Sequence, residues 1–299
     1  MSNQRLFAIT LFGGKKQLFS RHSRLRHLSG IIDFCDKIYF TIRFSPKWPL
    51  IPMSNREHID RILSQWEYDP EQVSVRIVSG DDGRDLIQMR IDMGLLQLEA
   101  TGRPDGKRPE GHETYFDYLN SLILNNGEDF VLSDEQCAAA DREFVQFYHR
   151  RICWLALRNY RKAVEDADHT LQFMDFCRDH APEEDWALTH EQYRPFVLFH
   201  RTQAAALVDL EESGPEAAIQ VINKELKRFR DLYPQYDAEE QFEENELVSR
   251  LSDLRESLRV QFDIGRTLDE QLADAVAAEK YELAAQLRDK LAQQQDRQN

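Results

Sequence analysis

Apolar and polar positions alternate in two short runs near residue 80, and this pattern predicts strands. The run VSVRIV covers residues 73–78, and the run IQMRIDM covers residues 87–93. The residues between them, 79–85, read SGDDGRD, which is typical of a turn. Together they predict a β-hairpin with one buried face. The second run would place four side chains on that face: Ile87, Met89, Ile91 and Met93.

Two flanking segments complete the predicted front of the chain. Residues 54–66 are expected to form a helix, with Ser54 as N-cap and Glu57 as its capping-box partner. Residues 100–113 hold three glycines and two prolines and are expected to form a loop. An ordered surface connection is favoured there, but the loop could also bind an anion through Arg103, Lys107 and Arg108. A helix is an alternative to the second strand, because Leu86, Met89, Met93 and Leu96 also have helical spacing.

Helical patterns dominate from about residue 130 onward. Ten of the twelve glycines precede residue 128, so the later sequence has few breaks inside its periodic segments. Ser133 is expected to cap the first long helix, with Gln136 as its capping-box partner. Prolines and glycines then delimit predicted helices over 133–157, 160–180, 195–213, 215–233 and 243–262. The last helix carries a coiled-coil-like seam with 4-3-4 spacing, formed by Leu247, Leu251, Leu254 and Leu258.

Two segments of this helical portion resemble the helix–helix hinge of the tetratricopeptide repeat. They cover residues 157–171 and 210–226, and small residues there allow antiparallel helices to approach closely. The matching residues are Tyr160, Ala163 and Ala167 in the first segment and Gly214, Ala217 and Ala218 in the second. The two segments are too far apart for a regular array, so we expect two repeat-like hairpins. Ordinary antiparallel helix packing would produce the same pattern.

Charge is distributed unevenly along the 299 residues. The chain has a net charge of −15, but residues 1–52 hold nine Lys/Arg against two Asp/Glu, a charge of +7, which leaves −22 for the rest. Residues 53–299 are acidic enough to repel phosphate backbones, so we do not expect this part of the chain to bind nucleic acid. The basic start is interpreted as an arm for an acidic partner, as a targeting segment, or as a disordered extension outside a native product that begins at Met53.

Candidate chemistry is sparse in the sequence. It contains no P-loop, Gly-rich dinucleotide turn, nucleophile elbow or HExxH motif, so neither enzymatic activity nor a cofactor is expected. Cys177 and His180 form one close pair, which is too little for a metal site. The widely spaced cysteines are expected to be reduced and mostly buried: Cys35, Cys137, Cys153 and Cys177. No apolar run reaches the ~20 residues of a membrane span, and we expect a cytoplasmic protein.

The last thirty residues predict a short helical hairpin over 266–295. Each of its two helices carries one apolar stripe, formed by Leu268, Leu272, Ala275 and Val276 in the first and by Tyr281, Ala284, Leu287 and Leu291 in the second. Helices of three to four turns bury too little surface to be stable alone. We expect Ala284 and Ala285 to pack closely across the hairpin, and further apolar surface to come from the preceding helix, another copy or a partner protein.

This segment closely resembles the UVR domain, the UvrB/UvrC motif, and the chain's layout is similar to uncharacterised bacterial proteins that contain it. The match rests on Leu268, Leu272, Ala275, Glu279, Tyr281, Glu282, Ala284, Ala285, Leu287, Arg288, Asp289 and Leu291. The resemblance implies a hairpin for protein–protein contact, as in excision-repair subunits, Clp-protease adaptors and arginine-kinase activators. Four residues are expected in the hairpin core: Leu272, Tyr281, Ala284 and Ala285. Three more are candidates for reading a partner, or else are solvated: Glu282, Arg288 and Asp289.

The sequence thus predicts an α+β protein that is predominantly α. Its expected parts are the extension 1–52, a small α/β portion 53–130, a helical scaffold 131–263 and the hairpin 266–295. The favoured function is a non-enzymatic adaptor in protein quality control that binds a protein or itself through the hairpin. Two alternatives stay open: an accessory factor in DNA excision repair, and an enzyme with its site near residues 73–112.

Overall fold

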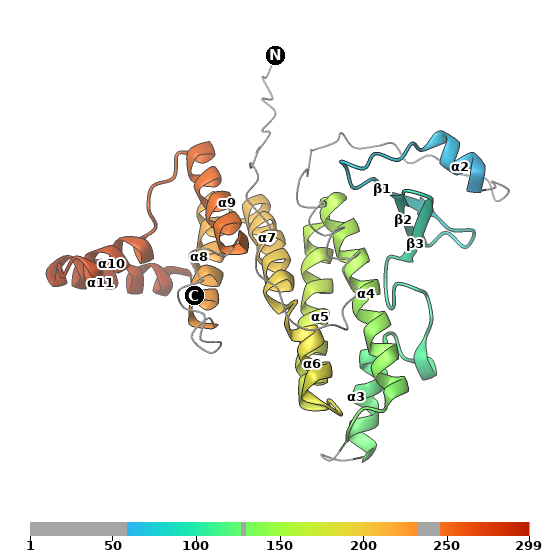
Figure 1. Ribbon diagram of the computed structural model, residues 1–299. Helices are drawn as coiled ribbons and strands as arrows, with labels where there is room; N and C mark the ends of the chain where they lie inside the picture. Colours follow the sequence, from blue (N-terminus) through green and yellow to red (C-terminus); the bar gives the residue numbers. More distant parts are fainter. Residues whose placement is uncertain (1–58, 127–129, 233–245, 299) are drawn as a thin grey trace. The chain divides into compact units, whose positions relative to one another are not determined.

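The computed structural model describes residues 59–126, 130–232 and 246–298, which form two compact units (Figure 1). The first unit contains the described residues of Met1–Gly127 together with Ala138–Asn159. The second contains those of Glu128–Cys137 and Tyr160–Asn299. Predictions for residues 1–52, including Cys35, and for the helix cap at Ser54 lie outside the described residues.

A three-stranded antiparallel sheet forms the front of the first unit, after helix α2 (Ile59–Gln65). The strands are β1 (Val75–Ser79), β2 (Asp85–Ile91) and β3 (Gly94–Glu99), in the order β1-β2-β3. In the turn between β1 and β2, the amide of Gly83 donates to the carbonyl of Gly80 (3.0 Å). The predicted β-hairpin is therefore confirmed, and the helical alternative for residues 86–96 is wrong.

The central strand differs from its prediction, because both of its faces are buried. Every residue from Leu86 to Arg90 is buried, whereas Met93 lies in the turn after β2 and is 91% exposed. On the polar face, the side-chain oxygen of Gln88 accepts from Arg76 (2.7 and 2.9 Å), and its amide nitrogen donates to Gln97 (2.9 Å). This hydrogen-bonded row satisfies the polar atoms, so that polar residues are stable at buried positions.

The side chain of Arg90, which is buried, connects β2 to the segments before and after the sheet's first two strands. The Arg90 Nε donates to the carbonyl of Trp66 (2.9 Å), which ties the segment after α2 to β2. Its Nη1 donates to the carbonyls of Asp92 (3.0 Å) and Gly94 (2.9 Å) in the turn before β3. A guanidinium has five donors in a planar fork, so one side chain can satisfy several carbonyls of a tight turn.

The loop predicted over 100–113 is confirmed, with a short 3-10 helix, η1 (Pro109–Gly111), inside it. It leads into α3 (Tyr115–Asn126), which the sequence pattern did not predict, and α4 follows (Asp134–Ala156). The α4 capping box is confirmed: Ser133 N–H donates to Gln136 (2.8 Å), and Gln136 N–H donates to the Ser133 hydroxyl (3.3 Å). Most of α4 belongs to the first unit and packs on the sheet, with Cys153 Sγ 3.7 Å from Met89 Sδ.

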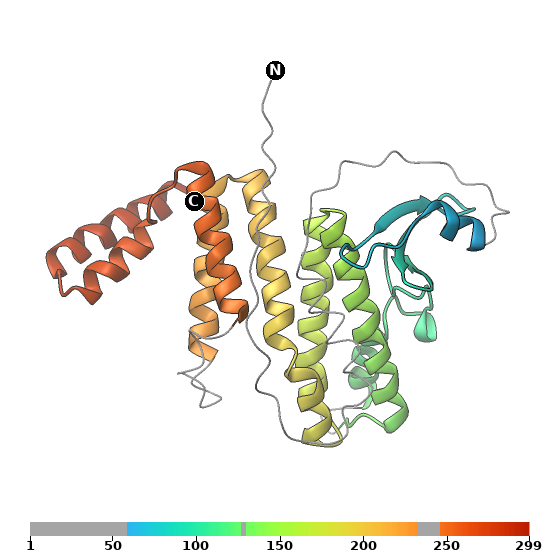
Figure 2. The same cartoon turned by 45° about the horizontal axis from the view of Figure 1, so that its top comes forward.

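Between α4 and the terminal hairpin, the second unit contains further helices. They are α5 (Tyr160–Asp179), α6 (Glu184–Glu191), α7 (Arg194–Glu212), α8 (Pro215–Leu232) and α9 (Glu246–Phe262). In Figure 2, α7 lies between α5 and α8, and α8 lies beside α9. Gly214 separates α7 from α8 with φ +92°, a conformation that glycine adopts without steric cost. The predicted helices are confirmed over the described residues, and α6 is an additional one.

Small residues line the helix contacts of the second unit. Ala163 and Ala167 in α5 and Ala218 in α8 are fully buried, which lets neighbouring helices approach closely. In α9, the predicted seam is shifted by one position at its start. The buried residues are Val248, Leu251 and Leu258, whereas Leu247 and Leu254 are half-buried. The seam is therefore the flank of a packed helix pair rather than a regular coiled coil.

The described cysteines, Cys137, Cys153 and Cys177, are free and buried, as predicted. Over residues 59–126, 130–232 and 246–298, no helix is both long enough and apolar enough to cross a membrane.

Candidate functional site

The chain's last described segment is the predicted helical hairpin. It consists of α10 (Leu268–Ala277) and α11 (Tyr281–Gln298), which run side by side (Figure 1). The reversal uses Glu279 with φ +56°, a left-handed conformation that ends a helix. The amides of Glu279 and Lys280 donate to the carbonyls of Val276 (3.0 Å) and Ala275 (2.8 Å). These bonds satisfy carbonyls at the end of α10 and fix the tight turn between the two helices.

The hairpin has a very small core. Its buried residues are Ala275, Ala284 and Leu287, and the half-buried Leu268 and Leu272 pack against them. Alanines at the contact bring the two helix backbones close together, but they bury little apolar surface. A core of this size contributes only a few kcal/mol, on the order of one or two large buried side chains. The hairpin therefore depends on other contacts for stability.

Two of the residues predicted for this core are instead exposed. Tyr281 is 68% exposed because it is the first residue of α11, where a side chain points back over the turn and beyond the end of α10. Ala285 is exposed because it lies 100° around α11 from Ala284, which faces α10. The two other predictions hold, since Ala284 is buried and Leu272 packs against the core.

Three large apolar side chains close to the hairpin turn in sequence are exposed. Val276 is 52% exposed, Tyr281 68% and Leu283 44%. We name these three residues the turn patch. Tyr281 and Leu283 are two positions apart on α11 and so point to different sides of that helix. Large exposed apolar side chains on so small a hairpin are candidates for contact with a partner.

The charged candidates for partner recognition lie on α11 and are all exposed: Glu282, Arg288 and Asp289. Arg288 forms an ion pair with its neighbour Asp289 at 3.4 Å. Both side chains of this pair are mostly solvated, so the pair contributes little to stability and leaves both groups accessible.

One carboxylate joins the hairpin to α9. Glu270 accepts hydrogen bonds from the Thr267 amide (2.8 Å) and hydroxyl (3.1 Å), and its amide donates to that hydroxyl, which completes a capping box. The same carboxylate pairs with Arg259 and, at 3.6 Å, with Arg255 of α9. Burial raises the pKa of Glu270, but the hydrogen bonds from Thr267 and Arg259 outweigh it and hold the pKa below its ordinary value.

The loop of residues 100–113 is held by a buried carboxylate that the sequence did not reveal. Glu143 of α4 is fully buried and accepts from the amides of Tyr115 (2.7 Å) and Phe116 (3.1 Å) at the start of α3. Its Oε2 also lies 3.2 Å from Nε of Arg103, a side chain that is 8% exposed. Arg150 of α4 donates to the carbonyl of Gly102 (2.7 Å). The loop is therefore an ordered surface connection, as the favoured interpretation held.

Metal-ligating side chains are scattered over the described residues. Among them, no three or more His, Cys, Asp or Glu side chains gather in a way that could hold a metal ion. Near the predicted Cys/His pair, Nδ1 of His180 lies 2.9 Å from the carbonyl of Phe130. No family of known proteins, no curated protein and no solved structure matches this chain.

Proposed function

We propose that this chain is a non-enzymatic adaptor that binds a protein partner, or a second copy of itself, through the α10–α11 hairpin. One observation carries the proposal: the turn patch is exposed on a hairpin whose own core is only three buried residues. Covering Val276, Tyr281 and Leu283 would remove apolar surface from water, which favours association. The exposed Glu282 lies beside the patch and would add selectivity rather than affinity.

The helical second unit supports the adaptor proposal as its scaffold. Helices α5, α7, α8 and α9 pack in sequence order and bury the small residues Ala163, Ala167 and Ala218. This packing agrees with the proposal that the scaffold is related to tetratricopeptide hairpins, whose role is to present binding surfaces. The resemblance of the hairpin to the UVR domain favours protein quality control as the setting.

Deleting Leu268–Asn299 tests the proposal. We expect the shortened chain to remain folded, with unchanged thermal unfolding of the rest, and to lose its partners in affinity capture or its self-association in light scattering. The double substitution Tyr281→Ser and Leu283→Ser should do the same with the hairpin present, whereas Lys290→Ser on the same helix serves as the matched control. If the shortened chain keeps its partners and its oligomeric state, the hairpin is not the binding element.

The identity of the captured proteins separates the two settings. Recovery of a protease or unfoldase would favour quality control, whereas recovery of excision-repair subunits would favour the repair alternative. DNA binding by residues 53–299 that weakens steeply with salt would also favour repair, because it would show direct phosphate contacts.

A further inference from the structure

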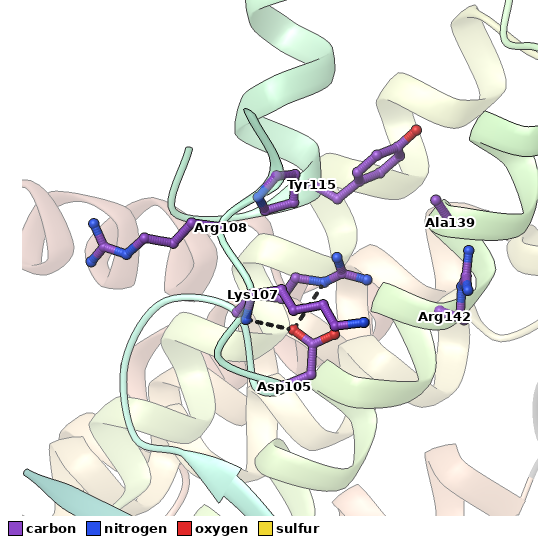
Figure 3. A pocket seen from close by; sticks show the side chains of 8 residues that line it. Asp105, Lys107, Arg108, Tyr115, Ala139 and Arg142 are labelled. Atoms are coloured by element: carbon purple, nitrogen blue, oxygen red, sulfur yellow. Dashed lines mark hydrogen bonds and ion pairs between the residues drawn. The ribbon is translucent and has the colours of Figure 1, made fainter. Parts of the chain in front are cut away.

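A pocket of about 310 Å³ opens in the first unit, between the loop of residues 100–113 and α4 (Figure 3). Its lining comes from residues 103–109, from the start of α3 and from the first unit's part of α4. The residues are Arg103, Asp105, Lys107, Arg108, Pro109, Tyr115, Ala139 and Arg142. A volume of this size is at the lower end of the range for small-molecule sites.

The pocket lining is basic, although the chain as a whole is acidic. Four cationic side chains and one carboxylate line it, in a protein of net charge −15. Two of the cations already have partners: Arg103 pairs with Glu143, and Arg108 pairs with Glu113 at 2.8 Å. A pocket in which cationic side chains outnumber carboxylates attracts anions.

Two cations of the pocket have no acidic partner. Within the part of the chain that the structure describes, neither Lys107 nor Arg142 forms an ion pair, and the one hydrogen bond from the Arg142 side chain goes from Nε to the carbonyl of Ala138 (3.2 Å). In Figure 3, Lys107 extends toward α4, the helix that carries Arg142, whereas Arg108 points away from the other labelled side chains. Lys107 and Arg142 are therefore available to a bound anion.

The loop that carries Lys107 is held in place by its own hydrogen bonds and by contacts with α4. The Asp105 carboxylate accepts from the Lys107 amide (3.0 Å) and from Gln146 (3.1 Å), and its Oδ1 lies 3.5 Å from Arg103. Asp105 is thus engaged in positioning the loop. Gly102 has φ +63°, a left-handed conformation that glycine adopts without strain and other residues rarely adopt. A preformed site loses little conformational entropy on binding.

The remaining lining points to an organic ligand rather than a bare ion. Pro109, Ala139 and the ring of Tyr115 supply apolar surface beside the cations. Guanidinium and ammonium groups are the side chains that bind phosphate most strongly. We propose that this pocket binds a small phosphate ester, with the phosphate on Lys107 and Arg142 and the organic body against Pro109 and Tyr115.

Calorimetric titration of the full chain tests the proposal, with phenyl phosphate and ribose 5-phosphate as probes. We expect at least one probe to bind at millimolar concentration or below, and more tightly than phenol or inorganic phosphate. Lys107→Ala and Arg142→Ala should each weaken binding about fivefold or more, since each removes a charged hydrogen-bond donor. Both side chains are exposed, so the variants should keep the fold, which thermal unfolding checks. Lys162→Ala, an exposed lysine of α5, is the matched control.

Three outcomes would overturn the proposal. Absence of binding by both esters at millimolar concentration excludes the site. Equal affinity for inorganic phosphate shows that the organic body is not recognised. Unchanged affinity in both pocket variants shows that the ester binds elsewhere on the chain.

Discussion

The loop of residues 100–113 and the terminal hairpin are stabilised in opposite ways. The loop lies over fully buried charge: Glu143 binds two amides and Arg103, and Arg150 holds a loop carbonyl. The hairpin contains three buried apolar residues and exposes three others near its turn. One region pairs its buried charges within its own unit, and the other leaves apolar side chains exposed.

This difference underlies the two binding modes that we propose for the chain. Buried ionic networks fix backbone geometry, because any displacement leaves a charge or an amide without a partner. A fixed loop suits a small ligand that needs charges at set positions. A thinly packed hairpin suits a protein partner, since the partner can supply the burial that the hairpin lacks.

The largest expected effect follows from removing the buried carboxylate of the loop. Glu143→Gln leaves Arg103 buried beside a neutral group, and we expect it to lower the free energy of unfolding by about 3–5 kcal/mol. Urea denaturation of the full chain measures this loss. Glu135→Gln, at an exposed position in the first turn of the same helix, should cost much less. Similar losses in both variants would show that the buried network does not stabilise the first unit.

Truncating the hairpin core should have a local effect instead. Leu287→Ala removes most of a buried side chain and should cost about 2 kcal/mol or more, enough to open a hairpin with so small a core. We expect amide hydrogen exchange over residues 268–291 to lose its protection while the main unfolding transition stays unchanged. The exposed Leu283→Ala is the control and should leave exchange unaltered. A shift of the whole transition would mean that the hairpin is coupled to the rest of the chain.

The smallest expected effect is a pH dependence in the first unit. Burial lowers the pKa of His149 in α4 from its ordinary 6.5, and its Nδ1 is shielded without a hydrogen-bond partner. Below pH 6.5 the unfolded chain takes up a proton that the folded chain resists, so stability should fall as the pH drops from 7.5 to 5.5. His149→Gln should reduce this slope in urea denaturation. An unchanged slope in this variant would exclude His149 as the source.

Much of the helical fold could be predicted because its signals are local. The boundaries of α5, α7 and α8 follow from Gly214, Pro215 and polar breaks, and Ser133 with Gln136 marks the start of α4. Strand β3 was missed because its sequence, GLLQLE, does not alternate cleanly between apolar and polar residues. Helix α6 has eight residues and only one buried position, so its periodicity is too weak to detect.

The candidate sites were predictable only in part, because their decisive contacts are nonlocal. The basic residues of the loop were visible, but nothing near Arg103 in the sequence indicates that Glu143 of α4 is its partner. Apolar spacing found Ala275, Ala284 and Leu287. It also placed Tyr281 in the core, whereas this side chain is exposed at the first residue of α11. Its exposure depends on where the turn places the backbone, which apolar spacing does not show.

Glu270 has a consequence for how the hairpin is presented. The same carboxylate starts α10 through its capping box and joins α10 to Arg259 of α9. Fraying of the first turn would therefore also release the tether to α9, and detaching the tether would loosen that turn. Formation of the first turn of α10 is thus coupled to its attachment to α9. A partner that bound the hairpin would meet it already held in one orientation against α9.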